Sequence, residues 1–438
     1  MNTTILTSAW EAIILNFSPV FTQPTAQIFI NLVTGWILCT CRRTITGIIP
    51  FAQPKGKRPH DAYHRLFPKS RWLPAHLWKL LAELLIGLFY PAGTVWMDMD
   101  DTIFHRTGQK IDGAGWWRDP LRSTASHVVH CWGLNLVVLT LRVRPPWGGE
   151  PLGLPINMRL HRKNGPGLIE LAEQMLAEVK GWFPERQFMM GADGFYATLA
   201  GCGAAYTHLV SRMRCDAAIY ELPTKKPKHQ RGPHRKKGKR LPTPAQIAFR
   251  TMSADRQVKS WQRVKTCERG KTKYRLVYAK AVIWYKVSHL PVLLVISRDP
   301  AGKEKDDFFF TTDLKLTPAE VIGGFAGRWS IEDTFKNTKQ SLGSEQPQTW
   351  KGPGPERAAV VSLWLYSVVW AWYIRYGYGK TSLPIIPWYA AKTHPSFQDA
   401  LAALRRVLWR KRIIVMFGNH TVPARIIEFF IDAVATAA

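Results

Sequence analysis

Three acidic residues lie where the sequence patterns of predicted elements begin or end, and their side chains suit metal-dependent chemistry. Asp100 ends a strand-like run, Asp193 ends a second apolar run, and Glu332 lies in a helix-like segment. Carboxylates at strand ends are exposed at the edge of an open α/β sheet, where ligands bind. Two aspartates and a glutamate supply the oxygen ligands that paired Mg²⁺ ions need for phosphoryl transfer. Taken singly, each aspartate is also explained as a turn former or a cap.

The segment around Glu332 predicts a helix with one mixed-charge face. Steps of four and seven residues return nearly to the same side of an α-helix, so Glu332, Lys336 and Lys339 share one face. Arg328 lies one turn earlier, and Ser330 is a candidate N-cap. A solvated helix stabilised by a Glu–Lys pair would show the same spacing. The alternative is a helix face that binds metal and phosphate.

The choice of the first acid is open within one short strand. The run TVWMDMDD at 94–101 alternates as a β-strand does, which places Asp98 and Asp100 on one face and Asp101 on the other. The phrase Asp-x-Thr favours Asp100, with Asp98 as the second choice.

The composition predicts a folded and strongly basic protein. The chain has 438 residues, of which 46% are hydrophobic, and this is enough for two or three domains with real cores. Lys and Arg number 60 against 31 Asp and Glu, and the net charge of +29 favours a polyanionic partner. Nucleic acid is the commonest such partner, with anionic membranes and ribosomes as alternatives.

The densest basic stretch is KKPKHQRGPHRKKGKR at 225–240, which has nine Lys or Arg and no acid. Its scattered Pro and Gly and its lack of apolar residues predict a flexible loop that buries no core.

The cysteines and the uncharged runs predict neither a metal site nor a membrane span. The six cysteines show no C-x-x-C pairing, which suits a reducing cytosol. Cys39 and Cys41 with His60 and His64 make a poor zinc pattern. The uncharged runs at 12–41 and 358–374 are interrupted or short, so core helices are favoured over membrane spans.

Periodicity divides the chain into helical ends and a strand-rich middle. Residues 1–92 have helical spacing, and so does the stretch that follows the break GPGP. Thr317, Pro318 and Glu320 predict a helix start with a capping box. The middle combines a helical pattern with strand-like runs, which predicts an α/β layer with a mixed sheet. These runs lie at 94–101, 127–143, 186–193, 273–287, 290–297 and 306–312.

The order and context of the three acids resemble a known family. Asp100, Asp193 and Glu332 lie in the phrases DDT, ADGFY and RWSIEDTFKNTK. These phrases resemble the catalytic motifs of bacterial insertion-sequence transposases of the Asp-Asp-Glu (DDE) class.

A second motif resembles one branch of that class. Arg328, Glu332 and Lys339 keep the spacing of the Tyr-Arg-Glu-Lys signature that marks its cut-and-paste branch. Phe325 stands at the Tyr position, so the role of that hydroxyl is lost or moved. The resemblance covers roughly 94–345.

The resemblance implies an α/β fold with a ribonuclease-H-like catalytic core, in which helices flank a mixed sheet. A β-rich insertion would interrupt this core, and helical regions would precede and follow it. The implied units are a helical DNA-binding region at 1–92, the core at 93–213 and 314–345, the insertion at 214–313 and a helical region at 346–438.

The resemblance also implies an activity. Asp100, Asp193 and Glu332 would be catalytic and would bind two Mg²⁺ ions, which Mn²⁺ can replace. Such an enzyme binds the terminal repeats of a mobile element as a homodimer, cleaves the ends and joins the 3′-hydroxyl to target DNA. It would act on nucleoid DNA in the bacterial cytoplasm and would not bind a membrane. The residues then expected to contact double-stranded DNA are Arg328, Lys336, Lys339, Lys225, Lys226, Arg235, Lys236, Lys237, Lys239 and Arg240.

Three other interpretations share part of this pattern. A catalytically inactive or domesticated DNA-binding protein of the same fold would keep the charge without a working metal site. A nuclease with the same core would cut without joining. An RNA-binding, ribosome-associated protein explains the charge of +29 but not three acids at the ends of elements. The presence of all three acids favours the enzyme.

Overall fold

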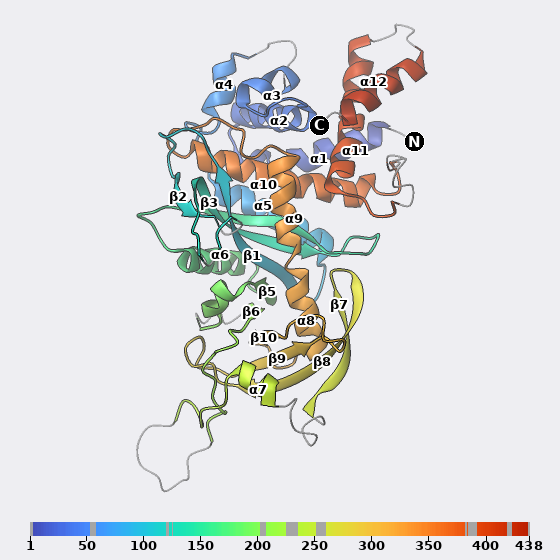
Figure 1. The fold of residues 1–438 in the computed structure, drawn as a ribbon. Helices are drawn as coiled ribbons and strands as arrows, with labels where there is room; N and C mark the ends of the chain where they lie inside the picture. The colour runs from blue at the N-terminus through green and yellow to red at the C-terminus, as the bar shows by residue number, and fades with distance from the viewer. Residues whose placement is uncertain are drawn as a thin grey trace.

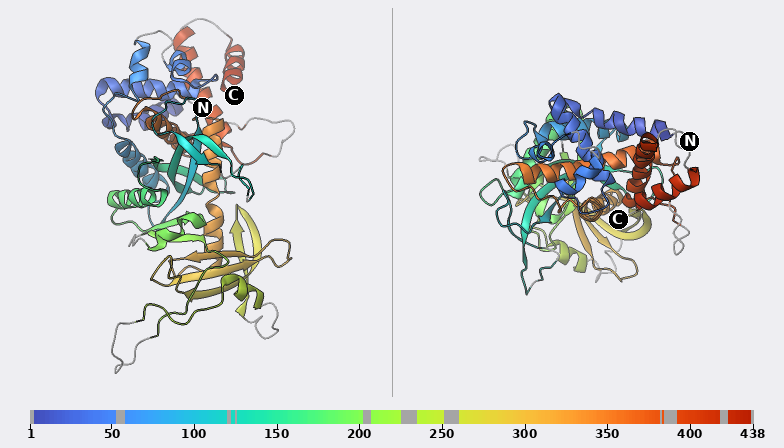
Figure 2. Two further views of the ribbon diagram at one scale, coloured as in Figure 1. Left: turned by 60° about the vertical axis from the view of Figure 1, so that its left-hand side comes forward. Right: turned by 90° about the horizontal axis from the view of Figure 1, so that it is seen from above.

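The structure is a computed structural model. It describes residues 3–52, 58–119, 122–124, 126–201, 207–224, 235–250, 260–381, 383, 392–417 and 423–436. Helices gather at one end of the molecule, the central strands lie in the middle, and antiparallel strands extend the sheet toward the other end (Figures 1 and 2).

Among the described residues, ten strands form one mixed sheet. Their order is β2-β3-β1-β5-β6-β10-β9-β8-β7, and β4 pairs with β3 outside this path. The first six strands are β1 (Val95–His105), β2 (Gly115–Arg118), β3 (His130–Val143), β4 (Leu152–His161), β5 (Phe188–Ala192) and β6 (Thr207–Arg212). The others are β7 (Gln262–Glu268), β8 (Lys271–Val282), β9 (Val292–Arg298) and β10 (Asp307–Thr311). β1 pairs antiparallel with β3 and parallel with β5, so the predicted mixed sheet is confirmed.

The strands of the predicted insertion continue the core sheet. β10 pairs antiparallel with β6 of the core and with β9, and β8 and β7 follow in antiparallel order. Helix α8 (Pro318–Gly327) contacts strands from both parts and then leads into α9 (Ser330–Gln340). Figure 1 shows α8 and α9 passing in succession from the insertion to the central strands.

Helices flank the central strands, as the ribonuclease-H-like fold requires. Helices α5 (Pro74–Phe89), α6 (Leu168–Trp182) and α9 all contact β4, and α9 also contacts β1. The remaining α-helices are α1 (Thr3–Leu15), α2 (Gln23–Leu38), α3 (Ile45–Ala52), α4 (His60–Arg65), α7 (Pro244–Arg250), α10 (Gly354–Trp372), α11 (Phe397–Phe417) and α12 (Ala424–Thr436). Shorter turns are η1 (Ser18–Val20), η2 (Gly194–Gly201) and the π-helical η4 (Tyr373–Gly377).

The N-terminal and C-terminal helices share one core. Phe17 and Phe29 from the N-terminal part pack their rings against Trp364 of α10, with ring centroids 4.8 and 5.1 Å apart. Trp372 donates its indole N–H to the carbonyl of Leu6 at 3.1 Å. The expected region boundaries at 92 and 346 therefore separate segments that touch in the folded protein, and they stay predictions.

One segment of the described residues, Gly354–Gly377, is long and apolar enough to cross a membrane. It is α10 with the turn η4, and 94% of its apolar window is buried inside the protein. Arg357 fixes its start by donating to the carbonyls of Phe67 and Trp72 at 2.8 and 2.6 Å. The apolar surface of this helix is therefore used for core packing.

Helix α8 starts as predicted, whereas α9 does not. Thr317 and Glu320 form the expected capping box at the start of α8. Ser330 was expected to cap α9, but it is the first helical residue, and Trp329 occupies the cap position with helical dihedral angles and no capping side chain. The cap prediction is wrong because Arg328 and Trp329 keep the chain helical between α8 and α9. The first N–H groups of α9 therefore bond to carbonyls of this linking turn.

Candidate active site

The sheet register places Asp100 beside Asp193. Strands β1 and β5 run parallel, and Met99 is paired with Ala192. Asp100 and Asp193 are the next residues on the two strands, so they lie side by side where β5 ends. The two aspartates, 93 positions apart in sequence, meet because of this pairing.

Arg328 connects this pair to Glu332. Its guanidinium donates to Oδ2 of Asp100 at 2.5 Å and to Oε1 of Glu332 at 3.2 Å. Arg328 comes from the turn between α8 and α9 and is only 8% exposed, and Glu332 lies in the first turn of α9. Asp193 and Arg328 also line the same pocket. Arg328 therefore links Asp100 to Glu332, and Asp193 lies beside Asp100 on the neighbouring strand.

The acids are spread around Arg328 and are not gathered at one point. Within the part of the chain that the structure describes, they do not form a group whose oxygens all lie within 4.8 Å of one another. The guanidinium fills the space between Asp100 and Glu332.

Asp100 is in an unfavourable place for a negative charge. Burial raises the pKa of its carboxyl from the usual 3.8 to about 7; Arg328 opposes this rise, while Asp193 and Asp101 add to it. The attraction of Arg328 thus does not offset burial and two neighbouring acids. A divalent cation would relieve this excess of negative charge, and carboxylate oxygens are the ligands that Mg²⁺ and Mn²⁺ accept.

A comparison with protein families agrees with this geometry. A family model described as a DDE superfamily endonuclease matches residues 16–273. The match spans more than half of the chain and includes Asp100 and Asp193. The chain belongs to the DDE endonuclease superfamily. Endonucleases of this superfamily act on DNA and use divalent metal ions. The chain matches no curated protein.

Asp98, the second choice for the first acid of this DDE endonuclease, has a structural role. It is fully buried and forms a two-pronged ion pair with Arg142 of β3, whose Nε donates to Oδ2 at 2.9 Å. Ser330 approaches the same oxygen at 3.5 Å. The alternation of β1 places Asp98 and Asp100 on one face, but Arg142 and α9 cover that face at Asp98. We therefore keep Asp100 as the first acid.

The turn after β5 fixes Asp193. Its Oδ1 accepts hydrogen bonds from the backbone N–H groups of Phe195 and Tyr196 at 3.0 and 3.4 Å, and this turn begins η2. Ser211 of β6 donates its hydroxyl to the carbonyl of Asp193 at 2.7 Å. The aspartate thus serves as a turn former, and its carboxylate also belongs to the acidic site.

Sequence reasoning missed the pair formed by Tyr196 and Asp101. The Tyr196 hydroxyl donates to Oδ1 of Asp101 at 3.2 Å. Burial raises the pKa of Asp101, and Asp193 adds to that rise. The doubled aspartate in DDT and the tyrosine in ADGFY were the available signals, but strand alternation placed Asp101 on the other face. The structure makes it an electrostatic neighbour of the site.

A pocket of about 410 Å³ contains Asp193 and Arg328, and its lining includes four arginines and three acids. Arg269, at the tip of the β7–β8 hairpin, stacks its guanidinium 3.7 Å from the ring centroid of Trp329. The β7–β8 hairpin therefore reaches the start of α9, the helix that carries Glu332. The pocket is lined by Asp193, Gly194, Arg212, Glu268, Arg269, Arg275, Ser297, Asp307, Phe309, Ile322, Phe325, Ala326, Arg328 and Trp329.

Phe325, at the Tyr position of the signature, lies on the wall of this pocket. Its ring packs against Phe309 with centroids 5.0 Å apart, and Arg212 lies over it at 5.3 Å. Phe325 therefore keeps the aromatic ring that a tyrosine would place here but has no hydroxyl.

The helix cations expected to contact DNA have different surroundings. Arg328 is paired with the acids, as described above, and Lys336 is exposed on α9. Lys339 is partly buried, and burial lowers the pKa of its amine against the opposing effect of Glu345, Asp119 and Cys131.

Of the basic stretch 225–240, the structure describes residues 235–240. Lys225 and Lys226 lie outside the described residues. Residues 235–240 return along 220–221, where Tyr220 forms a bridge with Arg240. Lys237 lies over the rings of Tyr220 and Tyr285 at 4.2 and 4.5 Å, so its position is fixed by cation–π contacts. Arg235, Lys236 and Lys239 complete the described part.

Proposed function

We propose that this DDE endonuclease is a transposase of the cut-and-paste branch marked by the Tyr-Arg-Glu-Lys signature. It would bind the terminal inverted repeats of a mobile element, cleave the ends and join the 3′-hydroxyl to target DNA. The reaction would be phosphoryl transfer with two Mg²⁺ ions, for which Mn²⁺ can substitute. The observation that carries the proposal is that strand register places Asp193 beside Asp100, which Arg328 links to Glu332.

In this proposal the three acids hold the metal ions. Ions held there would supply Lewis-acid activation of the scissile phosphate and of the attacking hydroxyl or water. Arg328, released from Asp100 and Glu332, is then close enough to donate to a phosphate oxygen beside them. A guanidinium suits this change of partner because its fork fits carboxylate and phosphate alike.

Charge supports a DNA strand entering beside the acids. The net charge is +29, and Arg269 lines the pocket that contains Asp193, where Arg212 and Arg275 are paired with Asp307 and Glu268. Neutralising phosphates is the main source of affinity in protein–DNA complexes. Lys336, Lys339 and the basic stretch 225–240 are proposed to add phosphate contacts. We further propose that the protein holds two DNA ends as a homodimer on the bacterial nucleoid.

A second candidate function is a catalytically inactive DNA-binding protein of the same fold. Arg328 favours this alternative, because a cation fixed between Asp100 and Glu332 neutralises these acids without metal. The two candidates differ in one property, which is whether metal displaces Arg328 and permits cleavage.

The test compares Glu332→Gln with Asp333→Asn, its exposed neighbour on α9. The substrate is a duplex that carries the inverted repeat flanking the gene, and cleavage, joining to a target plasmid and DNA affinity are measured in Mg²⁺. Glu332→Gln should lose cleavage and joining and keep the affinity within about twofold, because it removes a metal ligand and no phosphate contact. Asp333→Asn should behave as the unaltered protein does.

Each other outcome has a definite meaning. Cleavage by Glu332→Gln at the unaltered rate would overturn the site assignment. Cutting without joining would indicate a nuclease, and tight binding without cleavage in Mg²⁺ or Mn²⁺ would indicate the inactive DNA-binding protein.

A further inference from the structure

Three side chains of different metal-binding chemistry meet at the C-terminal end of β1. They are His105, Asp119 and Cys131, and one ligand atom of each lies within 4.8 Å of the ligand atoms of the other two. Among the described residues, this is the one group of three or more histidine, cysteine or acidic side chains that meets this distance. The group lies five residues along β1 from Asp100, so it is separate from the catalytic acids.

The strand register fixes these three donors. His105 is the last residue of β1, Asp119 directly follows β2, and Cys131 is on β3. β3 lies between the other two strands, pairing Gly133 with His105 and Cys131 with Trp117. Asp119 and Cys131 are 5% and 9% exposed, whereas the His105 side chain is partly exposed. Two donors are therefore held in place, and the third has room to rotate toward them.

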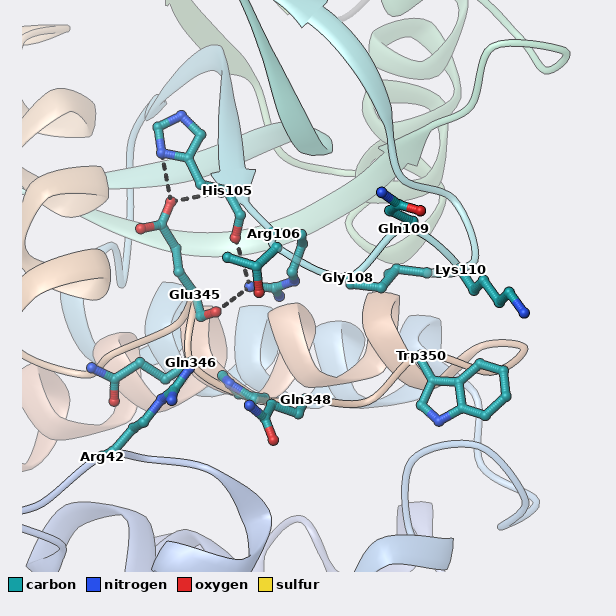
Figure 3. Close-up of a pocket in the computed structure, with 13 residues that line it drawn as sticks. Arg42, His105, Arg106, Gly108, Gln109, Lys110, Glu345, Gln346, Gln348 and Trp350 are labelled. Atoms are coloured by element: carbon teal, nitrogen blue, oxygen red, sulfur yellow. Dashed lines mark hydrogen bonds and ion pairs between the residues drawn. The ribbon is translucent and has the colours of Figure 1, made fainter.

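Glu345 supplies a fourth donor next to His105. Its Oε1 lies 3.7 Å from Nδ1 of His105 and accepts a hydrogen bond from the His105 backbone N–H at 2.7 Å. Arg106 fixes the backbone of Glu345 by donating to its carbonyl at 2.6 Å. Figure 3 shows the imidazole of His105 facing the carboxylate of Glu345 at the edge of a pocket. This pocket of about 590 Å³ is lined by His105 and Glu345, so an ion can reach these two donors from solvent.

We propose that His105, Asp119 and Cys131, completed by Glu345, bind a transition-metal ion of the Zn²⁺ type. One imidazole nitrogen, one sulfur and carboxylate oxygens form the donor set that suits Zn²⁺ or Co²⁺, whereas Mg²⁺ prefers oxygen alone. The three donor atoms lie within 4.8 Å of one another, and bonds of about 2.0–2.3 Å to one ion require them to be somewhat closer. Rotation of the His105 side chain would bring its ring nitrogen closer to the other two donors. Binding replaces the S–H bond of Cys131 by a metal–sulfur bond and releases the proton to water.

The surrounding charges agree with a dication. Asp119, Glu345 and a Cys131 thiolate would carry three negative charges against the nearby cations Lys339 and Arg106, so a negative charge would remain for a metal ion to offset. Arg122 also pairs with Asp119 at 3.5 Å, but its own side chain is largely exposed, so solvent screens that pair. A metal here would join the ends of three strands to the segment after α9 and would fix the surroundings of Lys339.

The test titrates Co²⁺ into the purified full-length protein after it has been treated with a chelator and freed of the chelator. A Co²⁺–thiolate bond gives an intense charge-transfer absorption that oxygen ligands do not give, so the catalytic acids do not contribute. We expect this absorption to saturate at one equivalent, to disappear on addition of Zn²⁺ and to be absent in Cys131→Ser. Cys39→Ser is the matched control, because Cys39 and Cys41 are another place where thiols could bind Co²⁺, with their sulfur atoms 3.6 Å apart. The absorption should persist in this variant.

A second variant covers a failure of Cys131→Ser to fold. His105→Ala changes a partly exposed side chain at a strand end, and it should weaken Co²⁺ binding at least tenfold while Zn²⁺ loses its effect on the melting temperature. The proposal is overturned if the unaltered protein shows no thiolate absorption, if Cys39→Ser alone removes it, or if His105→Ala leaves Co²⁺ affinity unchanged. None of these outcomes depends on transposase activity.

Discussion

The guanidinium of Arg328 donates to the carboxylate of Asp100 across 2.5 Å, which joins residues 228 positions apart in the chain. The same guanidinium contacts Glu332 at 3.2 Å. An internal cation therefore occupies the space between Asp100 and Glu332, where two carboxylates would otherwise repel one another. Metal binding and the Arg328 contacts compete for the same carboxylate oxygens, and this competition gives the first prediction.

Replacing Arg328 should increase metal affinity and decrease catalysis. In Arg328→Ala, Mn²⁺ no longer competes with a guanidinium, so we expect binding to be roughly tenfold tighter, or ~1.4 kcal/mol. DNA cleavage should fall because the phosphate loses its donor. Mn²⁺ binding without DNA is measured by electron paramagnetic resonance, with exposed Arg214→Ala as the control. Weaker or unchanged Mn²⁺ binding in Arg328→Ala would show that the guanidinium does not compete.

The metal-free protein should lose stability as the pH rises toward neutrality. The pKa of Asp100 is 3.8 in its usual state and about 7 in the fold, so between these values the folded protein keeps a proton that the unfolded chain has released. The free energy of unfolding then falls with rising pH across this window, by up to a few kcal/mol. Asp100→Asn removes this contribution.

Urea unfolding at pH 5 and pH 8 in the presence of a chelator measures the effect. The difference between the two pH values should be smaller in Asp100→Asn than in the unaltered protein, and Asp333→Asn should not change it. An equal pH dependence in Asp100→Asn and the unaltered protein would rule out Asp100 as its source.

The buried pair of Asp98 and Arg142 should be important for stability. Asp98→Asn leaves Arg142 charged in a buried place, and breaking such a pair costs about 3–5 kcal/mol of unfolding free energy. The double variant Asp98→Asn/Arg142→Met removes the uncompensated charge and should recover a large part of this loss. Denaturant unfolding measures both, and Asp216→Asn, in an exposed pair, should have a small effect. A double variant less stable than Asp98→Asn would contradict this account.

The basic stretch should determine part of the salt dependence of DNA binding. Neutralising Lys225, Lys226, Lys236 and Lys237 to Gln should weaken DNA binding and lower the slope of log affinity against log salt. The slope should decrease by roughly 0.9 for each phosphate that these lysines neutralise in the unaltered protein. Fluorescence anisotropy at several salt concentrations measures the slope, with the exposed Lys303→Gln as the control. A slope that stays the same would exclude phosphate binding by this stretch.

Strong local patterns allowed several elements to be predicted. The apolar run at 127–143 became β3, and Thr317 with Glu320 marked the start of α8. Strand β4 was missed because Pro155 interrupts its pattern. Pro155 is tolerated there because β4 pairs only with β3 and the register shifts between Leu139 and Thr140, so no ladder hydrogen bond from its nitrogen is needed.

The sequence alone determined which side chains could do chemistry, because it contains residue type and local spacing, and these predict Asp100, Asp193 and Glu332 as a metal-binding set. The tertiary structure decided which groups face one another. It assigned Asp98 to a buried ion pair, placed Arg328 between two acids and brought Cys131 to His105 and Asp119. These contacts join segments that are distant in the chain, and they depend on strand register and helix packing, which local periodicity does not encode.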